Sequence, residues 1–385
     1  MRAPVLTLDG LRSRFARRPN SLLDLADDIH ARCAVLGGAC IAAAFYAAAR
    51  DLLARHPDPS ALPLWGVPYA LDAGIDVVGL TTSIGAPAFD LQPDFDAVVV
   101  ERLRAAGALL VGKLPVDPFG RDAPVAHALA AIAAGLAAFV LIGDRADAVP
   151  VDCGLAVVKP TLAGVSIEGV SAMAPDVDGI AILTSDVAGG AVVRRALESV
   201  DGLVRPACPP GRLGLLGGET SEAAQAIIER LGLETVATDV TPFAEIAALA
   251  RDDVWLAPRL DDMATAFAEQ PELVPTRLRR RLSEALALPA CDLARAQRRL
   301  LALRRQVEAA FSDFDLLFVA PEFGSTGFVN ACGLAAIGLP DGGALVGAGG
   351  TDDRLGAIAA TLTALNKPRS TRPIDIPASS PLAHR

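Results

Sequence analysis

The sequence predicts a single α/β domain, and three observations lead to this prediction. Hydrophobic residues make up 52% of the 385-residue chain, which is enough to bury a large core. From Pro63 onward, strand-like apolar runs alternate with segments whose apolar residues recur at helical spacing, as in layered α/β domains. We find no internal repeat and no linker. We therefore expect one domain over residues 1–367 and a disordered tail over residues 368–385.

Each element is predicted from its own pattern. Helical spacing of apolar residues predicts helices over 6–18, after Ser21, and over 40–55, 97–107, 124–134, 187–200, 221–232, most of 243–311, 328–339 and after Asp352. Short apolar runs bounded by Gly, Pro or Asp predict strands over 64–71, 108–114, 139–143, 154–160, 212–218, 233–240, 315–321 and 344–348. Ser185 and Ser221 are the predicted N-caps of the helices that follow them.

Composition excludes several classes of function. The chain has 45 acidic and 35 basic residues, a net charge of −10, so no global positive field attracts nucleic acid. The six cysteines form no C-x-x-C pair and no signal peptide opens the chain, so we expect reduced thiols and a cytoplasmic location. The four histidines are scattered, and we predict no metal and no cofactor.

The uncharged run 124–143 is long enough to cross a bilayer, but its composition favours another structure. Alanine dominates the run, and Gly135 divides it. We expect a buried helix followed by a strand, and no membrane association.

Two long segments carry a family resemblance. Residues 63–120 contain GVP, then IDVVGLTTS, then AVVVERLRAAGA before a GK strand, and residues 157–190 contain VKPTLAGVSIEGV. These motifs resemble the amidase signature family. Residues 239–274 and 328–340 are similar to the allophanate hydrolases within that family, and the resemblance extends over residues 6–365. It implies a large mixed β-sheet covered by helices on both sides.

The resemblance also implies a Ser-cisSer-Lys triad, in which a neutral lysine activates the nucleophilic serine through the bridging serine. Aligning the motifs places Asp72 at the lysine position, Pro124 near the bridging serine and Ala148 near the nucleophile, within residues 145–148. No serine occurs between Ser83 and Ser166, and both catalytic loops are shortened. Lys113 and Lys159 match non-catalytic lysines of the family. We therefore predict that the family reaction is lost.

Two kinds of side chain could replace the lost chemistry. Cys153 lies nearest the nucleophile loop, but no histidine or lysine is close to it in sequence, so a buried structural cysteine is the favoured interpretation, as it is for Cys332. Several acidic residues lie near the positions of the family triad and could form a carboxylate pair or an ion site. Solvated side chains are the simpler interpretation. These residues are Asp72, Asp76, Asp144, Asp147 and Asp152.

One binding feature of the allophanate hydrolases is partly retained. The W-x-A-x-R motif that holds the substrate carboxylate matches residues 255–259, which places Arg259 at the arginine position and Arg251 at the tyrosine position. Two guanidinium groups could bind a small carboxylate or ureido ligand. The alternative is that both arginines pair with nearby aspartates on a helix surface.

The sequence therefore predicts a non-catalytic member of this family. We expect it to act as a scaffold or regulator in amide or urea-type nitrogen metabolism, as a homodimer or bound to an active amidase-family relative. The leucine and arginine stripes of residues 293–311 suggest a helix-packing surface, with burial inside the monomer as the competing explanation. The alternative function is a C–N hydrolase with rebuilt chemistry that acts on a small ureido or carboxylate substrate.

Overall fold

The computed structural model describes most of the chain. The described residues are 5–36, 42–84, 86–115, 123–144, 153–171, 177–199, 211–217, 222–259, 267–274, 276–323, 326–340 and 342–364. The predicted tail and Ser221 lie outside these ranges, so the predictions made for them stay predictions.

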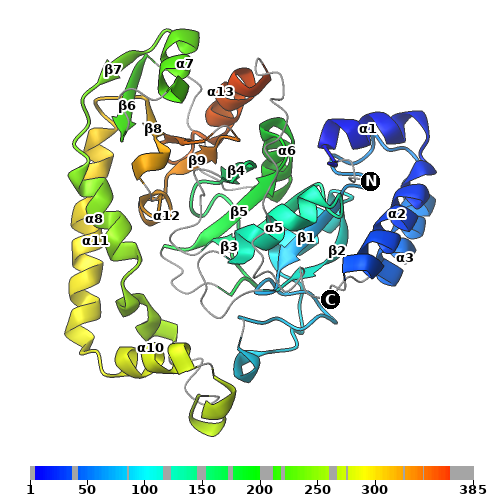
Figure 1. The fold of residues 1–385 in the computed structure, drawn as a ribbon, viewed down its shortest axis with the longest axis horizontal. Helices are drawn as coiled ribbons and strands as arrows, with labels where there is room; N and C mark the ends of the chain where they lie inside the picture. The colour runs from blue at the N-terminus through cyan, green and yellow to red at the C-terminus, as the bar shows by residue number, and fades with distance from the viewer. Residues whose placement is uncertain are drawn as a thin grey trace.

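A ten-stranded mixed sheet crosses the described part of the molecule in the order β2-β1-β3-β5-β4-β9-β10-β8-β6-β7 (Figure 1). β1 is parallel to β2 and β3, whereas β5 is antiparallel to both β3 and β4. The predicted mixed sheet is therefore confirmed. Its strands are β1 (Pro68–Asp72), β2 (Leu109–Leu114), β3 (Phe139–Asp144), β4 (Ala156–Lys159), β5 (Gly179–Thr184), β6 (Arg212–Leu216), β7 (Glu234–Val236), β8 (Leu316–Val319), β9 (Ala335–Gly338) and β10 (Ala344–Gly347).

Helices cover both faces of this sheet. They are α1 (Leu8–Arg17), α2 (Ser21–Leu36), α3 (Ala42–Arg55), α4 (Val98–Ala105), α5 (Ala123–Ala133), α6 (Val187–Leu197), α7 (Glu222–Leu231), α8 (Thr241–Ala250), α10 (Thr276–Leu286), α11 (Ala290–Ala310), α12 (Phe328–Ala331) and α13 (Asp352–Ala364). Short 3₁₀ turns are η1 (Pro87–Phe89), η2 (Asp253–Arg259), η3 (Pro271–Leu273) and η4 (Pro321–Phe323).

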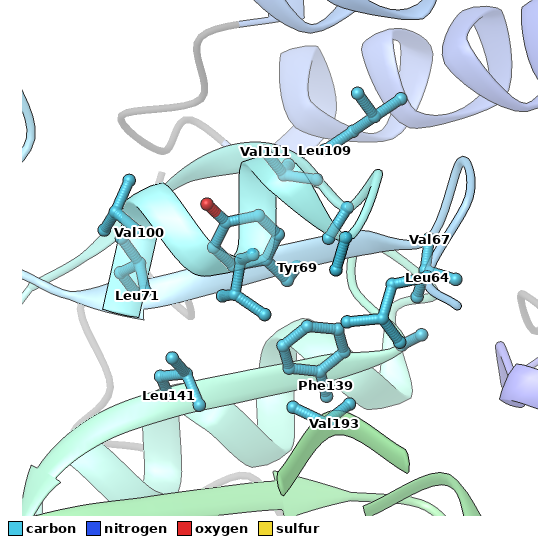
Figure 2. Packing of buried hydrophobic residues seen from close by; sticks show 14 of the residues in the cluster. Leu64, Val67, Tyr69, Leu71, Val100, Leu109, Val111, Phe139, Leu141 and Val193 are labelled. Atoms are coloured by element: carbon cyan, nitrogen blue, oxygen red, sulfur yellow. The ribbon is translucent and has the colours of Figure 1, made fainter. Parts of the chain in front are cut away.

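Alternation along the strands assigns each helix to a face. Successive strand residues point to opposite faces, so Tyr69 and Leu71 pack in one core with α1–α4 and α6, while Ala70 packs in another with α5, α8, α11 and α12. Tyr69 stacks on Phe139 of β3 with ring centroids 5.4 Å apart and planes within 7° (Figure 2). Both faces of β1 are buried, which explains its continuous apolar run.

Two central strands differ from the sequence prediction. β5 was not predicted, and β9 lies in a segment predicted to continue the helix that begins at Phe328. That helix ends at Ala331, and Gly333 adopts a left-handed conformation (φ 66°) that turns the chain into β9. Ala and Gly in β9 mimic a helical pattern locally, but pairing with β4 and β10 makes the segment a strand.

Two smaller predictions were also wrong in detail. β7 covers Glu234–Val236, only part of the predicted strand. The cap of α6 is Asp186, whose Oδ1 accepts the Gly189 N–H at 2.6 Å, whereas the Ser185 hydroxyl donates to the Leu6 carbonyl at 3.4 Å. A carboxylate is a stronger acceptor for the helix N-terminus.

The predicted Ala-rich helix and strand are confirmed as α5 and β3. Within the described part of the chain, the structure contains no helix whose length and apolarity would let it span a bilayer.

Candidate functional site at the end of the first strand

Asp72 is the last residue of β1, at an edge where the turn from 73 to 83 folds back. Its side chain is buried. Oδ1 accepts the Gly74 N–H at 2.5 Å, and Oδ2 accepts the Gly143 N–H from β3 at 2.9 Å. The carboxylate therefore joins the ends of β1 and β3, and each of its oxygens is occupied by a backbone donor.

Two glycines approach this carboxylate closely. A Cβ at Gly74 would lie 3.0 Å from Asp72 Oδ1. A Cβ at Gly143 would lie 3.4 Å from Oδ2 and 3.2 Å from Val170 Cγ1. A larger residue at either position would therefore crowd its neighbours.

Strand register brings Lys113 close to Asp72, because Lys113 pairs with Leu71 across β1 and β2. Its Nζ donates to the Thr81 carbonyl and the Thr82 hydroxyl at 3.0 Å each. Burial lowers the pKa of Lys113 to about 8, against the opposing effect of Asp76 and Asp72, which raise it. At pH 7 most of the amine is therefore charged, and it holds the 80–82 segment.

The sequence assigned Lys113 no role, because no motif reveals that its amine meets the Thr81 carbonyl and the Thr82 hydroxyl. It also missed Ser83 and Ser171, whose N–H groups donate to the carbonyls of Ala73 and Gly74 at 3.0 and 2.8 Å. Ser83 directly precedes the serine-free stretch, and Ser171 lies five residues beyond Ser166, which ends it. Hydrogen bonds to the turn after β1 bring both backbones to the site. Strand register is the signal that could have indicated Lys113.

The other predicted triad positions are less fully described. Pro124 stands in the first turn of α5, and its side chain lies outside the described part. Ala148 lies wholly outside it, as do Asp147, Asp152 and the Asp144 side chain. Asp76 accepts the Thr82 hydroxyl at 2.7 Å. Among the described residues, no group of three or more His, Cys, Asp or Glu is placed to hold a metal ion.

Three of the described cysteines differ in burial and in bonding. Cys153 is partly buried against the core that contains α5 and α8, with Sγ 3.8 Å from the Leu155 carbonyl oxygen. Burial raises the pKa of Cys332 to about 12, so its thiol stays protonated and unreactive, in line with the predicted core role. Cys33 is disulfide-bonded, which does not fit the expectation that all cysteines are reduced.

The two predicted ligand-binding arginines lie at either end of one segment. Arg251 is the exposed C-cap of α8. Arg259 is the last residue of η2, and its side chain lies outside the described part. Trp255 anchors this segment, because its Nε1 donates to the Leu249 carbonyl at 2.8 Å.

The aspartates near these arginines have other partners. Asp253 binds Arg281 of α10 through both carboxylate oxygens, with the shortest contact at 2.5 Å. Asp252 accepts the Val254 N–H at 2.9 Å. The Arg259 side chain and Asp261 lie outside the described residues, so pairing of the two arginines with nearby aspartates and ligand binding by them both stay predictions.

A mixed sheet covered on both faces, with a buried polar residue at the end of the strand that follows GVP, defines an amidase-type α/β protein. The Amidase family model matches residues 27–127. The chain is 30% identical over 311 residues to the 1-carboxybiuret hydrolase subunit AtzE of Pseudomonas sp. (strain ADP), with 67% of each chain covered. The chain belongs to the amidase signature family.

Solved structures share the fold of this chain. Kluyveromyces lactis allophanate hydrolase superposes with a TM-score of 0.77 at 19% identity, over 95% of this chain and 74% of that one. A structure described as a "vestigial protein complex" that reveals the origins of an s-triazine catabolic enzyme superposes with a TM-score of 0.77 at 22% identity, over 93% and 98% of the two chains. At these identities the likeness establishes the fold alone.

Proposed function

We propose that this chain is a non-catalytic amidase-fold protein that acts as a scaffold or regulatory partner in amide or urea-type nitrogen metabolism. The observation that carries the proposal is Asp72. It stands where the family motif has its lysine, and its two oxygens accept backbone N–H groups inside the fold. A carboxylate held in this way is a structural element, and it cannot supply the neutral amine that the family reaction needs.

Relatives that process ureido compounds, allophanate and 1-carboxybiuret among them, suggest where such a partner would work. The serine-free stretch from residue 84 to 165 supports the same proposal, because it leaves no hydroxyl of serine at the two remaining triad positions. Association with itself or with an active relative is the mode of action that fits a chain that keeps its fold without the triad.

Purified protein should show no hydrolysis of allophanate, biuret, malonamide or simple aryl amides above a no-enzyme control. The measurement is ammonia or amine release, with Kluyveromyces lactis allophanate hydrolase as the positive control. Asp72→Lys alone should not restore turnover, because the serines would still be missing. Turnover that follows the protein through gel filtration and disappears in a point variant would contradict the proposal.

The alternative is a C–N hydrolase with a rebuilt site acting on a small ureido or carboxylate substrate. Lys113 favours it, because an amine with a pKa of about 8 is partly neutral in weakly alkaline solution. Any genuine turnover should then rise towards pH 8 and be lost in Lys113→Met. Loss in Cys153→Ala, with Lys113→Met unaffected, would assign the chemistry to the cysteine.

A ligand site formed by Arg251 and Arg259 should select anions. A buried bidentate arginine contact is worth roughly 1.5–3 kcal/mol. Malonate should raise the thermal midpoint, and Arg259→Ala should abolish most of that increase, measured by thermal shift and calorimetry. Arg280→Ala is the control, since Arg280 is exposed on α10 and pairs with Glu284. Equal stabilisation of Arg259→Ala and wild type by malonate would show that the ligand binds elsewhere.

A further inference from the structure

The stripe of leucines that suggested an association surface is used inside the monomer. Leu300, Leu303 and Val307 of α11 are buried in the core that α11 shares with α8. The competing explanation from the sequence, burial within the monomer, is therefore correct for these residues. Any association through α11 must use its opposite face, and α11 runs along the outer edge of the molecule (Figure 1).

The arginines of α11 divide into two sets. Arg295 pairs with Asp292, Arg299 pairs with Glu245, and Arg304 donates to the Ala331 carbonyl, so these three serve the chain's own fold. Arg298 and Arg305 are exposed and form no ion pair with any residue in the described ranges.

The two remaining arginines share a face with exposed apolar side chains. Residues three or four apart lie side by side on a helix, so Arg298, Leu301, Ala302 and Arg305 form one outward ridge, which we call the α11 ridge. Leu301 is 54% exposed. The ridge is thus an apolar centre between two cations on a chain whose net charge is −10.

A second exposed apolar surface lies on the loop between β1 and α4. Phe95 is 80% exposed, Val78 54% and Leu91 47%. Leu91 exchanges backbone hydrogen bonds with Thr82, and the Val78 N–H donates to Asp96 at 2.9 Å, so residues 91–96 return to the 78–82 segment. We call Val78, Leu91 and Phe95, with Asp90 and Asp94 beside them, the loop patch.

The loop patch carries negative charge, which is opposite to the charge of the two ridge arginines. Asp90 and Asp94 are exposed, and neither forms an ion pair within the described parts of the chain, whereas Asp96 pairs with Arg104. An exposed aromatic side chain with acidic neighbours is suited to an apolar helix face bordered by arginines.

The ridge is poorly suited to pairing with itself. In a two-fold antiparallel pair centred between Leu301 and Ala302, Arg298 would face the partner's Arg305, and like charges would repel. The loop patch supplies both the apolar contact and the opposite charge.

We propose that a second copy of this chain binds head to tail, with the loop patch of one copy on the α11 ridge of the next. Such a contact is heterologous, so it closes into a ring or continues as a chain of subunits. The inference deepens the association part of the proposed function and does not depend on the outcome of the hydrolysis assay.

The test is a charge exchange followed by sedimentation velocity over a concentration series. The ridge variant is Arg298→Glu with Arg305→Glu, and the patch variant is Asp90→Lys with Asp94→Lys. Each alone should weaken self-association by about tenfold or more, because close charge pairs become like-charged. An equimolar mixture should recover assembly, since each variant surface then meets an opposite charge on the other variant. Phe95→Ser should weaken assembly without changing its salt dependence.

The matched control for the ridge variant is Arg17→Glu with Arg50→Glu, which makes the same net-charge change on exposed positions of α1 and α3. It should assemble like wild type, and circular dichroism melts should confirm that every variant folds. A wild-type chain that stays monomeric at all concentrations would overturn the proposal. Two weakened variants whose mixture fails to recover would show that the two surfaces do not meet.

Discussion

Asp72→Ala should lower the free energy of unfolding by about 2–4 kcal/mol, since it leaves the buried Gly74 N–H and the partly buried Gly143 N–H without their acceptor. Urea denaturation followed by circular dichroism measures the change. Asp72→Asn should recover only part of it, because the amide offers one acceptor oxygen and would turn its NH₂ group towards the other N–H.

The matched control is Asp58→Ala. Asp58 also accepts a backbone N–H, that of Ser60 at 2.9 Å, but it does so at the surface, where water can replace the carboxylate. Asp58→Ala should therefore lower the free energy of unfolding by much less than Asp72→Ala does. If Asp72→Ala were as stable as the Asp58→Ala control, Asp72 would not be a structural clamp, and a chemical role for its carboxylate would have to be reconsidered.

The second large effect is expected at Gly169, in the loop between β4 and β5. Its φ is +76°, and a Cβ there would lie 2.6 Å from the Ala97 Cα. Its carbonyl also accepts the Asp76 N–H at 2.8 Å, so the loop cannot move away without losing the contact beside the site. Gly169→Ala should therefore destabilise the protein by about 3 kcal/mol or more, as backbone strain and a backbone clash combine.

Gly79→Ala separates these two contributions. Gly79 has a similar φ of +83°, but no atom lies within 4 Å of the position its Cβ would take. Gly79→Ala should lower the free energy of unfolding by only about 1–2 kcal/mol, which is the penalty for an alanine in the left-handed conformation. Equal losses in the two variants would mean that the Ala97 contact relaxes freely and that the motif glycine is needed only for its conformation.

The family, the mixed sheet and the helical cover could be predicted from the sequence, because long motifs and apolar periodicity are local properties. The GVP strand ends at Asp72 as the motif alignment requires. The helix predicted over residues 6–18 is α1, and Leu8, Leu11 and Phe15 form its buried face. The prediction that Asp72 stands in place of the family lysine needed only the order of residues after GVP.

Tertiary structure decided what the neighbours of each residue are. β9 is a strand because β4 and β10 lie on either side of it, although its Ala and Gly residues fit a helix equally well. Lys113 joins the site because β2 pairs with β1 in a register that no motif encodes. Its oxygen partners come from a turn more than 30 residues earlier in the chain.

The two faces of α11 show the same division. The sequence determined that leucines and arginines alternate at helical spacing, which fixes two stripes on one helix. It could not determine which stripe meets α8, because burial depends on what packs against the helix. The structure buries Leu300 and Leu303 and leaves Leu301 exposed between Arg298 and Arg305, since only one side of a helix at the edge of the fold can reach the core.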